Sequence, residues 1–300
     1  MKFSFDFVGK RVILFAVAAL LLIGCAASVV LRGFSIGQDF AGGSQMTFIL
    51  RSEDDEKLEI STDIKGDIKA IFEGKGAKNL KISEGEEGSI IVDCAELSGE
   101  KQLEIKKAVA EKYHINDDEY SFKSVSGSVS KDLRDKAIMG VTVAVLLMLV
   151  YITVRFDWRS GVATVVCLIH DVIIMFGAYS LFAIDLDSNM IAAVLTILGY
   201  SINATIIVFD RVRENVRHNG KASFAENANK AINETFTRSL NTTLTTLFTI
   251  GMIFILGPAS IKAFALPIIV GVIAGLYSSV CLSTNIWVLL KGKKAFEKAE

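Results

Sequence analysis

One acidic residue of this 300-residue chain lies where a membrane would bury it. Asp171, in the run CLIHDVIIMFG, falls near the middle of a long apolar segment. A charged carboxylate at that depth is costly unless it is protonated, paired or hydrated, so Asp171 is a candidate for binding a proton or a cation in ion transport. The alternative is structural: His170 or a hydroxyl group of a neighbouring helix would hydrogen-bond a protonated Asp171. The other histidines, His114 and His218, lie in other segments, so His170 is not predicted to bind a metal ion.

Polar residues also interrupt the apolar segment LTILGYSINATIIVFDRVREN, from Leu195 to Asn215. Its Gly199 and Ser201 are small enough to let a neighbouring helix approach closely. Tyr200 and Asn203 could hydrogen-bond across a helical bundle. This segment is therefore predicted to pack against other helices.

A second polar segment, TRSLNTTLTTLFTIG, starts beside Arg238. We expect Arg238 to lie at the membrane edge, where a long basic side chain reaches the headgroups, unless an acid on the preceding span pairs with it. Spacing of three and four residues puts five polar side chains on one side of the helix: Asn241, Thr242, Thr245, Thr246 and Thr249. This seam is predicted to face other helices or water.

Charged residues close the first of these segments at Asp210, Arg211, Arg213 and Glu214. They are predicted to form an interfacial anchor and a cytoplasmic docking surface, with Asp210 and Arg213 close enough on one helix to attract each other. Ordinary termination of a span by basic residues explains the arginines but not the acids. Downstream, SFAENANKAINETF (Ser223 to Phe236) has an apolar side that predicts a helix lying along the membrane interface.

The composition indicates that a membrane holds these residues. Hydrophobic residues make up 51% of the chain, the mean hydropathy is +0.45 and there are only 2 prolines, which together exceed what is usual for a soluble domain of this size. The formal net charge of -1 gives no reason to expect a nucleic-acid partner. The four cysteines show neither a CxxC spacing nor a plausible internal pair, so no metal site and no disulfide are predicted.

Six segments are apolar over about 20 residues, the length that a bilayer core requires. They are Val12 to Leu31, Ala137 to Val154, Gly161 to Ile184, Met190 to Phe209, Leu240 to Leu256 and Ala263 to Leu290. Basic residues concentrate before the first segment and after the second, fourth and sixth, so these sides and both termini are predicted to be cytoplasmic. The predicted domains are a cytoplasmic N-terminus (1–11), transmembrane helix 1 (12–31), an extracytoplasmic domain with flanking hinges (32–136), transmembrane helices 2 to 6 (137–290) and a cytoplasmic basic tail (291–300).

The first segment has a second interpretation. A basic start, an apolar run and LIGC at Leu22 to Cys25 are together typical of a lipoprotein signal with a lipidated cysteine. The apolar run continues to Leu31, however, and this length favours an uncleaved membrane anchor.

The polar stretch after the first segment predicts a small α+β domain. SQMTFIL alternates as a strand, a helix with apolar residues every four positions ends at Gly74, NLKIS and SIIVDC are short strands, a second helix starts near Ser98, and EYSFKSVSGSV is a last strand. The order βαββαβ is the ferredoxin-like pattern, and no catalytic constellation lies in it. Asp39, Gly42 and Gly43, in DFAGG just outside the first span, are predicted to be its hinge.

A combination of motifs resembles the SecF proteins of the SecD/SecF family, which belongs to the resistance-nodulation-division (RND) superfamily. The motifs are GYSINATIIVFDRVREN (199–215), GQDFAGGS (37–44), RFDWR (155–159) and HD (170–171). The resemblance covers essentially the whole chain. It implies an α-helical polytopic membrane protein with six transmembrane helices, an RND-type half, and one extracytoplasmic α+β ferredoxin-like domain between helices 1 and 2.

The resemblance also implies a function without enzymatic activity. Proteins of this family assist the Sec machinery in the late, proton-motive-force-dependent translocation of polypeptides across the bacterial plasma (inner) membrane. The implied partners are SecD, the SecYEG channel, the translocating unfolded polypeptide and membrane lipids. Neither nucleic acid nor a cofactor is implied.

One position departs from the family pattern. The family's proton pathway includes an Asp in the fourth span, within Gly-Tyr-Ser-x-Asn-Asp followed by Thr or Ser, and an Arg at the start of the fifth. Thr205 and Arg238 match this pattern, but Ala204 stands at the Asp position. Alanine binds no proton, so three interpretations remain: Asp171 binds the proton, a water molecule or another cation uses Asn203 and the threonine seam, or the chain assists export passively.

An alternative function is that of an RND-type small-molecule exporter, working alone or with a partner. Exporters of the superfamily generally carry two six-span halves in one chain, whereas this chain has one, so a partner half is needed. An intramembrane protease is not predicted, because the sequence has neither an HExxH motif nor paired aspartates in its spans.

Overall fold

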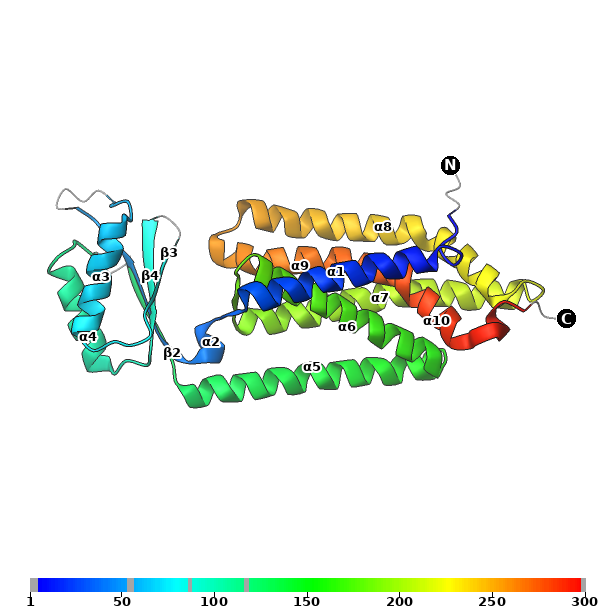
Figure 1. Ribbon diagram of the computed structural model, residues 1–300, viewed down its shortest axis with the longest axis horizontal. Helices are drawn as coiled ribbons and strands as arrows, with labels where there is room; N and C mark the ends of the chain where they lie inside the picture. Colours follow the sequence, from blue (N-terminus) through cyan, green and yellow to red (C-terminus); the bar gives the residue numbers. More distant parts are fainter. Residues whose placement is uncertain (1–4, 53–56, 86–87, 116–118, 298–300) are drawn as a thin grey trace. The chain divides into compact units, whose positions relative to one another are not determined.

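The structure is a computed structural model that describes residues 5–52, 57–85, 88–115 and 119–297. The chain divides into two compact units (Figure 1). The helical unit comprises Met1–Ser35 and Ile138–Glu300, and the sheet unit comprises Ile36–Ala137.

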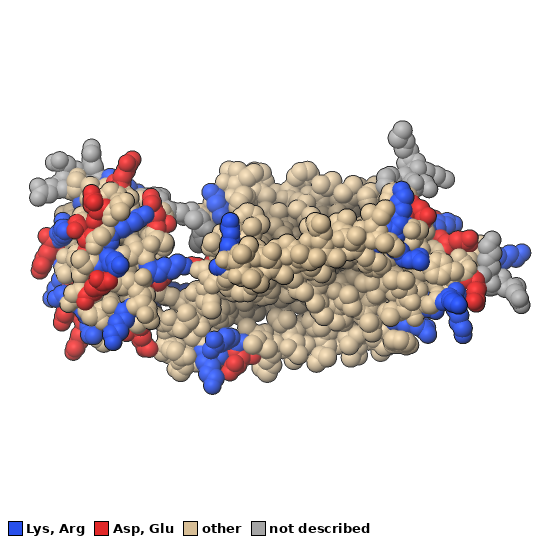
Figure 2. Space-filling view, in the orientation of Figure 1, with Lys and Arg blue, Asp and Glu red and all other residues tan. Residues whose placement is uncertain are grey.

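Six helices in the described part of the chain are long and apolar enough to cross a membrane, as the sequence predicts. They are α1 (Arg11–Arg32), α5 (Gly127–Arg155), α6 (Trp158–Leu181), α7 (Ser188–His218), α8 (Phe224–Leu256) and a composite span over Ile261–Ala295. The composite span draws on α9 (Ala259–Tyr277), the π-helix η3 (Ser278–Ser283), α10 (Thr284–Lys291) and the 3-10 helix η4 (Gly292–Ala295). Figure 2 shows a wide uncharged band on the helical unit, with charged side chains gathered at its ends.

α8 runs without interruption from Phe224 to Leu256, so the segment Ser223–Phe236 is helical as predicted but continuous with the fifth span, and its position along the membrane interface stays a prediction. The helix starts at a capping box, in which the Ser223 hydroxyl accepts the N–H of Glu226 at 3.2 Å and the Glu226 carboxylate accepts the N–H of Ser223 at 3.1 Å. Neither glycine nor proline follows before Gly251, so nothing ends the helix between this cap and the membrane. In the same way α7 continues past Phe209 to His218.

Glycines allow the inner helices of the helical unit to approach their neighbours closely. A Cβ atom added to Gly271 of α9 would lie 2.7 Å from the Cγ1 atom of Ile197 on α7. One added to Gly177 of α6 would lie 2.3 Å from the sulfur of Cys25 on α1. Any larger residue at these two positions would force the helices apart, because real Cβ atoms do not approach other heavy atoms that closely.

The sheet unit contains the predicted order of strands and helices. Its elements are β2 (Gly43–Ile49), α3 (Thr62–Gly74), β3 (Lys81–Glu84), β4 (Ser89–Cys94), α4 (Gly99–Ala110) and β5 (Tyr120–Val125). The strands form one antiparallel sheet in the order β3-β4-β2-β5. Met46 and Phe48 alternate into a fully buried core, which α3 closes with Phe72 and α4 with Ile105. Figure 1 shows α3 and α4 on the same side of the sheet. α5 begins directly after the sheet, at Gly127 instead of the predicted Ala137.

Three short elements accompany these. The helix α2 (Gln38–Ala41) precedes β2, and the two-residue strands β1 (Ser35–Ile36) and β6 (Asp185–Leu186) pair with each other. The Ser35 hydroxyl also donates to the Asp185 carboxylate. These contacts anchor the end of α1 to the connection between α6 and α7.

Candidate functional site

Asp171 of α6 has no exposed surface, and three hydrogen-bond partners surround its carboxylate. Ser201 Oγ lies 2.6 Å and Ser278 Oγ 2.7 Å from its Oδ2 atom. His170 Nδ1 lies 2.9 Å from its Oδ1 atom. The expected partners of a buried Asp171, a histidine and hydroxyl groups of neighbouring helices, are therefore both present. Because they belong to α6, α7 and η3, the carboxylate joins three segments of the bundle.

A further layer of hydroxyl groups extends this site. Ser279 Oγ lies 2.9 Å from Thr205 Oγ1 and donates to the carbonyl oxygen of Ser201 at 3.1 Å. The Cys167 thiol donates to the carbonyl oxygen of Ser278 at 3.7 Å. All of these side chains are buried, so the apolar bundle encloses a continuous polar site around Asp171.

The site lies on a local change of helix geometry. Ser278 and Ser279 open the π-helix η3, which interrupts the span between α9 and α10. Single-turn π segments inside α-helices are rare and are frequent at functional sites. These two serines are not among the site residues predicted from the sequence. The polar run YSSVCLSTN (277–285) inside an apolar segment is the signal that identifies them.

The arrangement can bind a proton or a small cation. The carboxylate accepts hydrogen bonds from the hydroxyls of Ser201 and Ser278, and protonation would convert one of its oxygens from acceptor to donor. Carboxylate and hydroxyl oxygens are also the ligands that hard cations prefer. No group of three or more His, Cys, Asp or Glu residues that could hold a metal ion occurs among the described residues. His170 Nε2 is buried without a partner in the described part of the chain, and its ring lines an apolar cavity of about 510 Å³ between α1, α6 and α10.

The other candidates for ion relay lie apart from this centre. Ala204 of α7 is buried, whereas Asn203 beside it is exposed. Arg238 is exposed and lies within α8, which begins at the Ser223 cap, and its place at the membrane edge stays a prediction. Within the ranges that the structure describes, the side chains of Asn203 and Arg238 have no hydrogen-bond or ion-pair partner.

The helix-packing motif of α7 is partly confirmed. The Tyr200 hydroxyl donates to Thr243 Oγ1 of α8 at 2.7 Å, which is the predicted hydrogen bond across the bundle. A Cβ atom added to Gly275 of α9 would lie 3.3 Å from Ser201 Cβ, so a helix does approach closely at Ser201. At Gly199, in contrast, a Cβ atom would meet no heavy atom of the described residues within 4 Å. Close approach at Gly199 therefore stays a prediction that requires another chain.

The polar seam of α8 is directed outward in this chain. Asn241, Thr242, Thr245 and Thr249 are exposed, and Thr246 is half-buried. The threonine hydroxyls donate to carbonyl oxygens of the preceding turn, such as Thr242 to Arg238 at 2.9 Å and Thr249 to Thr245 at 3.0 Å. Asn241 is therefore the one seam residue whose polar group extends beyond its own helix.

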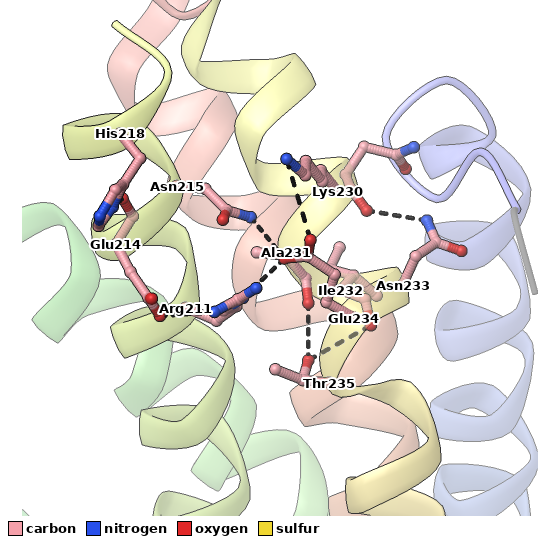
Figure 3. Close-up of polar contacts among 11 residues, drawn as sticks. Arg211, Glu214, Asn215, His218, Lys230, Ala231, Ile232, Asn233, Glu234 and Thr235 are labelled. Carbon is pink, nitrogen blue, oxygen red and sulfur yellow. Dashed lines mark hydrogen bonds and ion pairs between the residues drawn. The ribbon is translucent and has the colours of Figure 1, made fainter. Parts of the chain in front are cut away.

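The charged residues at the end of α7 hold helix ends together (Figure 3). Arg211 Nε donates to Glu234 Oε2 of α8 at 2.6 Å, and its Nη1 donates to Glu214 Oε2 at 2.7 Å. Asn215 also donates to the Glu234 carboxylate, at 2.9 Å. Lys230 adds a longer contact to Glu234, at 3.9 Å. This network attaches α7 to the first turns of α8.

The predicted attraction between Asp210 and Arg213 is wrong, because the end of α5 lies beside both residues. Asp210 instead pairs with Arg155 at 3.3 Å. Arg213 Nη1 donates to the carbonyl oxygen of Arg155 at 3.0 Å. The tertiary contact thus replaces the local one. A docking role for Asp210, Arg211, Arg213 and Glu214 stays a prediction.

The predicted hinge residues are packed within the sheet unit. Asp39 has a nearly buried side chain, with Lys123 Nζ at 2.7 Å from its Oδ1 atom. Gly42 and Gly43 have φ angles of 74° and 127°, which favour glycine. A Cβ atom on Gly43 would also lie 2.4 Å from the carbonyl oxygen of Cys94. The sheet itself therefore requires glycine at position 43, independently of any hinge movement of the adjoining chain.

Comparison with known proteins gives the family. A family model described as "Protein export membrane protein SecD/SecF, C-terminal" matches residues 104–293. The protein translocase subunit SecF of Petrotoga mobilis is 36% identical over 99% of this chain and 99% of its own length. The subunit SecF of Helicobacter pylori is 32% identical over 93% of this chain and 84% of its own length.

A longer relative shows the same fold. The subunit SecDF of Thermus thermophilus is 35% identical over 98% of this chain, a region that makes up 40% of SecDF. The crystal structure of a Thermus SecDF, described as a translocon-associated membrane protein, matches with a TM-score of 0.83 at 34% identity, over 97% of this chain and 39% of that one. With a family match over most of its length and relatives similar from end to end, this chain belongs to the SecD/SecF family of protein-export membrane proteins.

Proposed function

We propose that this chain is an accessory subunit, without enzymatic activity, of the Sec protein-export machinery in a bacterial plasma membrane. The observation that carries the proposal is the end-to-end similarity to a protein translocase subunit SecF, over 99% of both chains. In this role the chain acts with SecD and the SecYEG channel on an unfolded polypeptide late in its translocation. An ion gradient across the membrane supplies the energy.

Association with SecD is supported by the fused relative. This chain corresponds to 39% of the Thermus SecDF, so that protein carries a large additional part in the same polypeptide. In the proposed function, SecD supplies the counterpart of that additional part.

An exposed polar surface of the helical unit suits such a partner. We name it the α7–α8 face, and define it by Gly199, Asn203, Arg238, Asn241 and Thr245, all of which are exposed. Asn203 and Asn241 each lie within one turn of the hydrogen bond between Tyr200 and Thr243 that joins the two helices. Carboxamides and a guanidinium within spanning helices are costly against lipid, whereas another helical bundle offers them partners.

Ion coupling in this proposal is centred on Asp171, since Ala204 provides no titratable group on α7. Protonation of Asp171 would turn one of its oxygens from acceptor into donor and so rearrange the hydroxyl contact to Ser201 or Ser278. Those serines belong to α7 and η3, so a change at the carboxylate alters how α6, α7 and the π-helix pack together. Arg238 and Asn203 act on the α7–α8 face, where the partner supplies their counterparts.

The topology follows from the same proposal. The sheet unit is a ferredoxin-like domain on the extracytoplasmic side, which the element order βαββαβ and the strand order β3-β4-β2-β5 support. Both termini are cytoplasmic, which the basic residues at Lys10, Arg155 and Lys291 support through the positive-inside rule. Asp39, Gly42 and Gly43 connect this domain to the first span and act at its hinge.

Purification from native membranes tests this function. A tagged chain is expected to recover SecD-like and SecYEG-like chains after mild solubilisation, and its deletion to slow the appearance of secreted proteins outside the cell. If the tagged chain recovers neither partner and instead confers gradient-dependent transport of a small molecule into vesicles, the RND-type exporter is the correct function.

A further inference from the structure

A concave pocket lies at one end of the helical unit, separate from Asp171. Its volume is about 280 Å³. Charged and aromatic side chains make up most of its lining, namely Asp157, Arg213, Arg217, Phe224, Trp287 and Lys291. They come from the start of α6, the end of α7, the start of α8 and the end of α10. Four spans thus begin or end around this pocket, which places it at the level of the membrane surface.

The pocket carries an excess of positive charge. Three of its side chains are cationic, namely Arg213, Arg217 and Lys291, against one carboxylate. That carboxylate is already occupied, because Asp157 Oδ1 accepts the N–H of Ser160 at 2.7 Å and its Oδ2 accepts the indole N–H of Trp287 at 3.2 Å. Among the described residues no carboxylate forms an ion pair with any of the three cations. An anion entering the pocket therefore meets three cations against one carboxylate, Asp157, which forms no ion pair with any of them.

The walls of the pocket are aromatic and hold the lysine in place. Lys291 Nζ lies 3.8 Å from the ring centroid of Phe224 and 5.5 Å from that of Trp287. A cation stacked on two rings has lost part of its hydration and retains free donors for a ligand. Tryptophan beside basic residues is also typical of the membrane–water interface.

Exposed apolar surface adjoins the basic pocket. Trp158, the first residue of α6, is 56% exposed, and Val162 and Val166 continue the same face at 39% and 46%. Val216, which lines the pocket, is 36% exposed. A ligand with a phosphate group in the pocket could therefore lay a hydrocarbon chain along α6. A free phosphate or a nucleotide would leave this apolar surface unused.

We infer that this pocket binds the phosphate headgroup of an anionic phospholipid, with Arg213, Arg217 and Lys291 contacting the phosphate and the acyl chains lying against the exposed side of α6. Basic pockets between spanning helices are a recurrent means of recognising such headgroups. The site joins the ends of four spans, so a bound lipid ties α6, α7, α8 and α10 together at this end. The inference depends on membrane insertion and not on the export function.

The test uses the full chain in phosphatidylcholine nanodiscs that contain a minor fraction of phosphatidylglycerol. Native mass spectrometry after release measures how much of each lipid stays bound. The wild-type chain is expected to retain phosphatidylglycerol in preference to phosphatidylcholine. Each basic side chain near the membrane surface contributes about 1 kcal/mol to the binding of an anionic lipid, and about 1.4 kcal/mol corresponds to a tenfold change in affinity. Removing two cations, with Arg217→Gln and Lys291→Gln together, should therefore weaken phosphatidylglycerol binding about thirtyfold. Arg217→Gln alone, at an exposed position that folding does not need, is expected to weaken it about fivefold.

The matched control removes two exposed cations elsewhere, with Lys131→Gln and Arg134→Gln on α5, and is expected to leave retention unchanged. Equal retention by the wild type and the Arg217→Gln, Lys291→Gln double variant would overturn the inference. Displacement of the lipid by millimolar inorganic phosphate would show a phosphate site without lipid selectivity and would overturn it as well. Unchanged retention in the presence of phosphate supports the lipid.

Discussion

At the scale of single residues, the chemistry of this chain depends on where one carboxylate lies. Ala204 removes the acid from the family position in α7, but Asp171 on α6 brings a carboxylate to the same part of the bundle through its bond to Ser201, three residues before Ala204. A buried acid whose hydrogen-bond partners come from three segments is stable only while those segments stay in place. If Asp171 binds the ion, as we propose, ion binding and helix packing are linked at this residue.

Asp171→Asn is expected to abolish the gradient-dependent part of export while leaving binding to partners intact. Asparagine keeps the shape of the side chain but neither ionises nor exchanges a proton at neutral pH. The measurement is polypeptide translocation into proteoliposomes with and without an imposed ion gradient, and the variant should fall to the level seen without one. Asp132→Asn, which removes an exposed acid paired with Lys136, is the control and should keep the stimulation. Full gradient stimulation of Asp171→Asn would exclude the relay role.

The pH range over which the sheet unit is stable depends, at both its acid and its alkaline end, on a contact between α3 and the end of α4. Hydrogen bonds from Lys112 and Tyr113 lower the pKa of Asp67, so its contribution is present above the ordinary carboxyl pKa and is lost as the pH falls through the lower folded value. Burial and the bond to Asp67 raise the pKa of Tyr113 to about 12, so its contribution is present below the ordinary value and is lost as the pH rises through about 12.

Hydrogen exchange of α3 and α4 amides, measured against pH in the full chain, should show both losses of protection. Tyr113→Phe removes the alkaline loss and raises the pKa of Asp67, so its acid loss begins at a higher pH. If the variant lost its protection at the same acid pH as the wild type, the hydrogen bond between Tyr113 and Asp67 would have no effect on the pKa of the Asp67 carboxyl.

At the scale of elements, helix ends decide the architecture of the helical unit. The capping box at Ser223 starts α8 long before the apolar run, so the helix reaches from the charged network around Glu234 to the far end of the membrane. η3 has the opposite effect, because it interrupts a span and turns Ser278 towards Asp171. The capping box is a local sequence signal, whereas the effect of η3 depends on neighbouring helices.

Because α8 is continuous, the amides from Phe236 to Leu240 should exchange as slowly as those in the turns on either side. Thr237→Pro removes a backbone donor at an exposed position and should cost about 3 kcal/mol, with fast exchange appearing around residue 237. Thr237→Ala at the same position is the control and should keep the protection. Mass-spectrometric hydrogen exchange on the full chain distinguishes them. Fast exchange of this stretch in the wild type would instead indicate two separate helices.

At the scale of the whole molecule, the helical unit has an α7–α8 face that the described part of the chain leaves uncovered. The inner positions of α7 pack against α9, where Gly271 and Gly275 permit close contact, while Gly199 on the same helix has open space. Because Gly199 shares this face with the exposed amide of Asn203, the proposed function places a helix of the partner against it.

Gly199→Leu is therefore expected to reduce copurification of the SecD-like partner at least tenfold without lowering the thermal stability of the isolated chain, since nothing lies within 4 Å of the added atom. Gly140→Leu on α5, also in open space, is the matched control and should retain the partner. Equal recovery with both variants would place the partner on another face. Loss of stability in Gly199→Leu alone would show that the position is packed within the chain.

Much of this fold is predictable from local sequence. Six apolar segments define the spans because lipid requires every backbone polar group to be satisfied within a helix. Alternation in SQMTFIL and four-residue spacing before Gly74 identify a strand and a helix because each pattern places apolar groups on one face. Asp171 stands out as a candidate because a carboxylate inside such a span is costly.

Local sequence is therefore enough to predict the class of the protein, the number of spans and the identity of the central acid, since all three depend on the preference of each residue for water or lipid. The packing of the helices is needed to know what surrounds that acid, that Asp210 pairs with Arg155 instead of Arg213, and that Phe224, Trp287 and Lys291 form one pocket. These contacts join residues far apart in the chain. Their positions depend on how the helices pack against one another, which no local pattern contains.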